Sequence, residues 1–139
     1  MSASARPAAD GAPGYTETMP CEPESALRAR LLVSAALNAW GIAELADVGM
    51  LVVSELVNNA VTHTRCRVVR VVVRQEPGGL VRIGVADKCR AVPEMALPDD
   101  DSEGGRGLVL VDAVCWRWGY ERRSWGKLVW AQLRASGSC

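Results

Sequence analysis

The residues of this chain best suited to chemistry lie in one ten-residue stretch, SELVNNAVTH. Glu55, Asn59 and His63 recur every four residues, so on a helix with about 100° per residue they share one face with Asn58 and Thr62. A helix face in bulk water usually carries Lys, Arg and Glu. This face has one acid and no base, which suits a ligand or a polar cavity. The alternatives are a chance cluster of amides and a histidine with a purely structural role.

Two further segments carry groups that commonly bind ligands. Asp87 ends the apolar run VRIGVA, and a carboxylate at a buried strand end must be paired or hydrogen-bonded, unless that strand end is solvated. The stretch Gly104-Gly105-Arg106-Gly107-Leu108 precedes an apolar helical segment and offers free backbone N–H groups at the positive end of a helix dipole. Such a stretch is typical of anion sites and, taken alone, equally of flexible turns.

Hydrophobic periodicity predicts two helices that position these groups. Gly41 follows the first helix as a C-terminal stop, and the second helix contains SELVNNAVTH. The side of the first helix expected to be buried consists of Leu27, Leu31, Ala35 and Leu37. The two helices are expected at residues 24–40 and 44–64.

The rest of the body alternates β-branched runs with turns. A proline and two glycines between the first two runs predict a hairpin, and residues 88–106 form a long, acidic loop. Because no regular βαβ alternation occurs, the expected fold is an α+β, two-layer α/β sandwich, with helices on one face of a mixed, largely antiparallel sheet. The strands are expected at residues 67–74, 80–86, 116–121 and 127–134, with a short helix at 108–114.

Composition limits the domain organisation and the partners. The 139 residues suffice for one domain, at 21–136, after a disordered N-terminal tail at 1–20 that is rich in Ala, Pro, Gly and Ser. Sixteen basic and sixteen acidic side chains cancel, which argues against direct binding of nucleic acid. Without an apolar run of about 20 residues or a secretory leader, we expect a cytoplasmic protein that does not enter the membrane. Five scattered cysteines predict reduced thiols and no zinc site.

Tryptophan is concentrated in the C-terminal strands, while phenylalanine is absent. Tryptophan is enriched at binding hot spots, so these side chains are candidates for a partner surface. In a domain of this size the favoured interpretation is that they fill the core. The four tryptophans concerned are Trp116, Trp118, Trp125 and Trp130.

Together, these motifs resemble the GHKL superfamily of ATP-binding domains, found in DNA gyrase, MutL and histidine kinases. The residues that carry the resemblance are E-x-x-x-N-A-x-x-H on a helix, a strand ending in Asp87, and G-G-R-G-L before a helix. The segments LVVSELVNNAVTH, GGRGLVLVDAV and WGKLVWAQL are similar to the small actinobacterial relatives of the SpoIIAB and RsbW anti-sigma factor serine kinases. The similarity covers residues 24–134 and implies the GHKL (Bergerat) fold.

The resemblance also implies a role for each site residue. Glu55 corresponds to the general base that accepts the proton of the attacking hydroxyl. Asn59 corresponds to the residue that holds Mg²⁺ and the triphosphate of ATP, and Asp87 to the carboxylate that accepts a hydrogen bond from the adenine amino group. His63 is assigned to the phosphate side. Further ATP contacts are assigned to Gly104, Gly105, Arg106, Gly107 and Leu108.

Two departures from the family pattern bear on activity. The superfamily's D-x-G-x-G box is D-K-C-R-A here, so the hinge of the lid lacks both glycines. On the last strand, Leu128 stands where relatives often have a threonine that helps to hold adenine. These departures motivate an alternative in which the chain is a weak or inactive ATP-binding module that acts through protein binding.

The resemblance predicts an anti-sigma-factor-type serine/threonine protein kinase that uses ATP and Mg²⁺. Its expected partners are an anti-anti-sigma (STAS-domain) protein, which it phosphorylates, and a sigma factor, which it sequesters to regulate transcription. Homodimerisation is expected from the kinase family. The residues themselves do not identify the partner, the sigma factor or the triggering signal.

Overall fold

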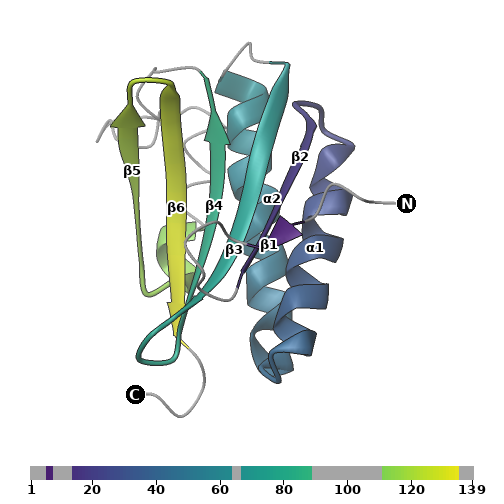
Figure 1. Cartoon of the computed structure of the whole chain (residues 1–139), viewed down its shortest axis with the longest axis vertical. Coiled ribbons are helices and arrows are strands. Elements are labelled where there is room, and N and C mark those ends of the chain that lie inside the picture. The colour runs from purple at the N-terminus through teal and green to yellow at the C-terminus, as the bar shows by residue number, and fades with distance from the viewer. Residues whose placement is uncertain (1–5, 8–13, 64–66, 89–110, 135–139) are drawn as a thin grey trace.

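Two layers, one of helices and one of strands, form the computed structural model, which describes residues 6–7, 14–63, 67–88 and 111–134 (Figure 1). Its described strands form one antiparallel sheet in the order β1-β2-β3-β4-β6-β5. The helical layer contains α1 (Ser25–Ala39), the 3-10 turn η1 (Ala43–Leu45) and α2 (Ala46–His63). The strands are β1 (Arg6–Pro7), β2 (Gly14–Pro20), β3 (Val68–Glu76), β4 (Leu80–Asp87), β5 (Arg117–Arg123) and β6 (Gly126–Arg134). The predicted two-layer α+β architecture is confirmed.

Glycines end the first helix and turn the first hairpin, as the sequence predicts. Gly41 has a φ of 75°, and the N–H of Ile42 reaches back to the Leu37 carbonyl at 3.0 Å, which closes the C-terminus of α1. Gly78 and Gly79, with φ of 81° and 75°, form the turn between β3 and β4. Residues 111–114 form one helical turn, within the short helix expected at 108–114.

The expectation of a disordered tail at residues 1–20 is wrong for Gly14–Pro20, which forms strand β2 against β3. Met19 is buried in the core, and buried Glu17 accepts a hydrogen bond from Arg28 on α1. The hydroxyl of Ser25 donates to the Pro20 carbonyl at 2.6 Å, which joins the end of β2 to the start of α1. The prediction failed because a strand that completes an existing sheet needs few apolar residues of its own.

The buried side of α1 also differs from the prediction. Leu27 and Leu31 are 55% and 60% exposed, whereas Leu37 is buried as expected. The other side of the helix packs inward because its small side chains allow α1 to approach α2 closely at Gly49. That side consists of Ala26, Ala29, Val33, Ala36 and Leu37.

Strand register separates the sheet into two faces. The inner face, against the helices, carries the apolar core through alternate residues such as Val71, Val85 and Val129. The outer face is the opposite side; in Figure 1, α2 lies partly behind β3 and α1 lies beside β2. Trp118 packs against the core, whereas Trp116 and Trp125 are 44% and 48% exposed and Trp130 lies on the outer face, so the core-filling interpretation is wrong for these three.

Helix α2, with the turn before it, is long and apolar enough to span a membrane by length and composition, with a hydropathy of 1.2. Of that stretch, 56% is buried inside the domain. It packs against α1 and against strands β4 and β6, and the core helix of a globular domain satisfies the same criterion. We therefore interpret α2 as the central core helix.

The contact at Gly49 gives a test of the helix packing. A Cβ at this position would lie 2.9 Å from Cγ1 of Val33 and 3.0 Å from Cδ1 of Leu37. Gly49→Val should therefore lower the free energy of unfolding by about 1 to 3 kcal/mol through overpacking. Asn58→Val, at an exposed position of the same helix, is the matched control and should change it by less than about 0.5 kcal/mol. Urea denaturation of both variants measures the difference, and equal stabilities would contradict the close packing.

Candidate functional site

The predicted site residues on α2 and β4 lie at the same end of the sandwich. Four residues connect the end of α2 at His63 to the start of β3, and β3 begins opposite the end of β4. The C-terminus of α2 and Asp87 are therefore brought together, at the upper end in Figure 1. Strand β6 begins at this end as well, because Asp87 pairs with Lys127 in the register of the sheet.

Asn59 and His63 carry buried polar atoms without partners. Asn59 is only 5% exposed, and its Nδ2 has no hydrogen-bond partner among the described residues. The same holds for Nε2 of His63, one helical turn further on. Buried polar groups are nearly always hydrogen-bonded, so two orphaned atoms on one helix face indicate a site that a ligand completes. Asn58 and Thr62, predicted on the same polar arc, are exposed instead.

Glu55 lies one turn before Asn59 and is partly buried. Burial disfavours the charged form, and it raises the pKa of the Glu55 carboxyl above its ordinary value. A carboxylate whose pKa is shifted toward neutrality is a better proton acceptor than a fully solvated one. The face predicted from SELVNNAVTH therefore has one candidate base beside two orphaned groups.

Asp87 has a partner that the sequence did not predict. The Lys127 Nζ lies 3.6 Å from Oδ2 of Asp87, and the two side chains are only 3% and 1% exposed. At this distance the contact is an ion pair without a short hydrogen bond. A buried carboxylate needs such a counter-ion, because an unpaired charge in the interior is very costly.

The last strand corrects the expectation for Leu128. The side chain of Leu128 lies on the outer face, where a Cβ added to Gly84 would lie 2.9 Å from Cδ1 of Leu128. The inner-face residue beside Asp87 is Lys127. Gly126 allows the start of β6 to lie this close to the end of β4, because a Cβ at position 126 would lie only 2.0 Å from the Asp87 carbonyl oxygen.

Lys127 could have been found from the sequence through strand alternation. In KLVWAQL, Val129, Ala131 and Leu133 alternate with larger or polar residues, which places Lys127 on the same face as the core. A lysine in phase with buried residues predicts a buried ion pair.

The phosphate side of the site is described only in part. Gly104, Gly105, Arg106, Gly107 and Leu108 lie outside the described residues, so their assignment stays a prediction. No group of three His, Cys, Asp or Glu side chains that could hold a metal occurs within the described ranges. Mg²⁺ in nucleotide sites is held by one or two protein oxygens together with phosphates, so a single amide such as Asn59 fits this ion.

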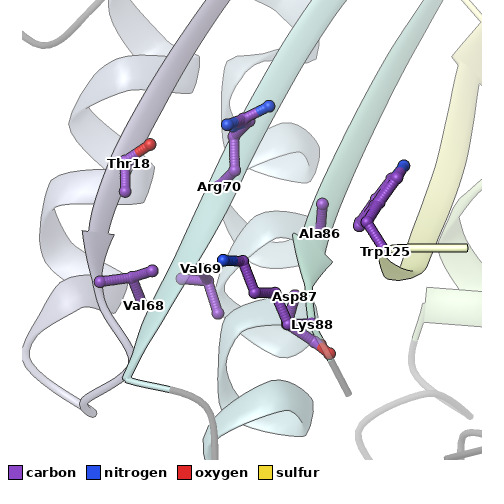
Figure 2. A pocket seen from close by; sticks show the side chains of 8 residues that line it. All are labelled: Thr18, Val68, Val69, Arg70, Ala86, Asp87, Lys88 and Trp125. Carbon is purple, nitrogen blue, oxygen red and sulfur yellow. The ribbon is translucent and has the colours of Figure 1, made fainter. Parts of the chain in front are cut away.

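A pocket of about 210 Å³ opens nearby but on the outer side of the strand ends (Figure 2). Glu55, Asn59 and His63 do not line it, so we distinguish it from the site on α2. Its lining residues are Thr18, Val68, Val69, Arg70, Ala86, Asp87, Lys88 and Trp125.

Cys21 and Cys115, the two cysteines among the described residues, form no disulfide. Burial and the nearby Asp112 carboxylate raise the pKa of Cys115 to about 11. Its thiol is therefore protonated, and unreactive, at neutral pH.

Comparison with known proteins identifies a matching domain family and a similar fold. The profile of the histidine kinase-like ATPase domain family matches residues 19–133. A histidine kinase domain of the blue-light activated histidine kinase from Erythrobacter litoralis EL346 has a similar fold, with a TM-score of 0.51 and 20% sequence identity. The alignment covers 86% of this chain and 63% of that domain, so this chain spans less than two thirds of it. No curated protein matches the sequence significantly.

Removal of the counter-ion of Asp87 should destabilise the fold strongly. Lys127→Met removes the cation beside a buried carboxylate, and we expect the free energy of unfolding to fall by about 3 to 5 kcal/mol. Combining it with Asp87→Asn should restore most of that loss. Arg123→Met is the control, since its ion pair with Glu121 is exposed and should contribute less than about 1 kcal/mol. Equal losses in the Lys127 and Arg123 variants would contradict a buried pair.

The raised pKa of Glu55 predicts a pH-dependent stability. The folded state holds the proton more tightly than the unfolded state, so this group contributes stability below its unfolded pKa and loses it as pH rises through the folded value. Glu55→Gln should therefore be at least as stable as the wild type at neutral pH, with its relative advantage shrinking as pH falls from the raised folded pKa toward 4.5, the ordinary value. Thermal unfolding between mildly acidic and neutral pH measures this, and a pH-independent difference would contradict it.

Proposed function

Because this chain belongs to the histidine kinase-like ATPase domain family, a family of ATP-binding domains with the GHKL fold, we propose that it is an anti-sigma-factor-type serine/threonine protein kinase. In this proposal, it transfers the γ-phosphoryl group of ATP to a serine of an anti-anti-sigma (STAS-domain) partner. It also sequesters a sigma factor and thereby regulates transcription. We also propose that the protein is cytoplasmic and forms a homodimer.

The observation that carries the proposal is the polar face of α2. Asn59 and His63 present buried atoms without hydrogen-bond partners in the described part of the chain, and Glu55 precedes them on the same face with a raised pKa. An orphaned buried donor costs about 1 to 3 kcal/mol, so a face with two of them is stabilised when a ligand provides acceptors. Phosphate oxygens are such acceptors.

Each residue has a distinct role in the proposed transfer. Glu55 accepts the proton of the serine hydroxyl as that oxygen attacks, which its raised pKa favours. Asn59 would hold Mg²⁺ through its neutral amide oxygen, and the ion would neutralise charge on the triphosphate. His63 would donate a hydrogen bond from Nε2 toward the phosphate side.

Asp87 would select the base of the nucleotide. Its carboxylate accepts hydrogen bonds only, and the adenine amino group is a donor that guanine lacks at the same position. Lys127 would keep this carboxylate ionised and fixed in place. Gly104, Gly105, Arg106, Gly107 and Leu108 remain the proposed contacts of the phosphates.

The pair between Asp87 and Lys127 also favours a second candidate function. The carboxylate that would receive adenine is already buried against a cation, and the adjoining D-K-C-R-A segment lacks the hinge glycines. Both features are compatible with a module that binds partner proteins and uses nucleotide weakly or not at all. Calorimetric titration with Mg-ATP separates the two functions, since no detectable binding at millimolar nucleotide supports the second.

Two substitutions on α2 separate binding from transfer. Asn59→Ala should abolish Mg-ATP binding, measured by calorimetry, because it removes the proposed metal and phosphate contact. Glu55→Gln should retain binding but lower the transfer of labelled γ-phosphate to the STAS partner by about 100-fold or more, because it removes the base. Asn58→Ala, at the exposed neighbouring position, is the control and should leave both unchanged.

Two outcomes would contradict these assignments. Normal Mg-ATP binding by a folded Asn59→Ala variant would remove the proposed site on α2. Transfer at the wild-type rate by Glu55→Gln would show that Glu55 is not the base. Far-ultraviolet circular dichroism of each variant establishes that the fold is retained.

A further inference from the structure

The outer face of the sheet carries a concentration of arginine that the neutral composition of the chain hides. The register places Glu76 and Glu121 on this face, as the only acidic residues of its described strands. On strands β3 to β6, six arginines share the face with these two acids, which leaves an excess of four positive charges there, while the whole chain has a formal net charge of zero. These are Arg70, Arg74, Arg82, Arg117, Arg123 and Arg134. We call this surface the arginine face.

Tryptophan rings hold several of these guanidinium groups in place. Arg82 lies over the ring of Trp130, with its Cζ 4.4 Å from the centroid. Arg117 and Arg134 both lie against Trp116, at 4.6 and 4.3 Å. These distances are within the range of cation–π contacts, and a stacked guanidinium keeps its N–H edges available for carboxylates.

A chain of polar contacts connects the strands across the arginine face. Arg82 pairs with Glu76 at 3.1 Å, and Gln132 donates to Glu76 at 2.6 Å. The Nε of Arg117 donates to Gln132, also at 2.6 Å. Groups fixed in this way lose little conformational entropy on binding, so the surface is preorganised for an anionic partner.

The pocket beside Trp125 adds an apolar anchor point to the same face. Val68, Ala86 and Trp125 provide apolar walls, while Arg70 and Lys88 provide cations at its margin (Figure 2). Its volume of about 210 Å³ is below the range of ordinary small-molecule pockets, about 300 to 1,000 Å³, and is suited to one side chain. Val68, 46% exposed, and Trp125 are available for such a contact.

The contacts favour a protein partner over a nucleic acid. Trp116 and Trp130 have guanidinium groups stacked on them, whereas binding of single strands depends on ring faces that receive bases. Glu76 and Glu121 interrupt the positive charge and would repel a continuous phosphate backbone. An acidic peptide can place its carboxylates beside the arginines and away from Glu76 and Glu121, because its charges are carried by separate side chains.

We propose that the arginine face is a docking surface for an acidic protein segment that inserts one apolar side chain into the pocket beside Trp125. Carboxylates of the segment pair with the arginines that stack on Trp116 and Trp130, and the apolar side chain contacts Val68 and Trp125. The arginines of this surface are separate from the polar face of α2, and Asp87, which also lines the pocket, is the residue shared with the proposed nucleotide site.

The five tryptophans provide an internal test by NMR. The probe is the capped peptide EDDLEDDE, titrated into the full ¹⁵N-labelled chain at low ionic strength. The indole N–H signals of Trp116, Trp125 and Trp130 should shift, while those of Trp40 and Trp118, on the helix side, should not. Binding should weaken as salt is raised, because exposed charges are screened within about 10 Å at 0.1 M.

Substitutions assign the charged and apolar parts of the contact. Arg134→Gln and Arg70→Gln should each weaken binding of the peptide about fivefold, through loss of a charge-assisted contact. Arg122→Gln is the matched control, because Arg122 is an exposed residue of β5 on the opposite face. Its substitution should change the affinity for the peptide by less than about twofold, since a remote exposed charge is screened by salt. EDDSEDDE should bind more weakly than EDDLEDDE, and Trp125→Ala should remove that difference.

Three results would overturn the proposal. The first is the absence of shifts in the outer-face indole signals at millimolar peptide. The second is equal loss of affinity in Arg122→Gln and Arg134→Gln. The third is tighter binding of a twelve-nucleotide oligothymidylate than of EDDLEDDE, with shifts in the same indole signals, which would assign the face to nucleic acid.

Discussion

The pairing of β4 with β6 is the constraint on which the rest of the structure depends. Its register sets Asp87 opposite Lys127, and the absence of a Cβ at Gly126 allows the two strand ends to meet. Because side chains alternate between faces, the same register sends Leu128 and Trp130 outward. A shift of one residue would bury Trp130, expose Lys127 and leave Asp87 without its cation. The candidate site and the arginine face therefore follow from one set of backbone hydrogen bonds.

Most of the fold follows from the sequence, because hydrophobic period and glycine position determine elements locally. The hairpin at Gly78, the end of α1 at Gly41 and the polar face of α2 are all of this kind. Strand β2 could not be predicted in this way, because β3 and α1 stabilise it through Met19 and Glu17. The prediction of the buried side of α1 was wrong for a related reason. Large leucines usually identify the core, but here Val33 and Leu37 face α2, where the missing side chain of Gly49 leaves room for them.

The site was predictable in its residue types and less so in its contacts. Glu55, Asn59 and His63 share a face because helical geometry alone relates them. Lys127 lies 40 residues from Asp87 along the chain, and only pairing of β4 with β6 brings them together. Net charge was similarly uninformative, because a sum over the chain does not show how the sheet places arginines on one side. The family comparison establishes the ATP-binding fold, and the individual roles rest on the chemistry of these side chains.

The low charge of the α2 face follows from the energetics of burial. Beside Asp87, the interior already contains one charge pair, and each further ion would need its own counter-ion or would shift its pKa until neutral. Amide and imidazole groups avoid that cost and lose only the hydrogen bonds that are left unmade, about 1 to 3 kcal/mol for each orphaned group. A ligand with several acceptors recovers this energy on binding. Neutral, unsatisfied groups on α2 thus favour an anionic ligand, whereas lysines on this face would pair with Glu55 or Asp87 and close the site.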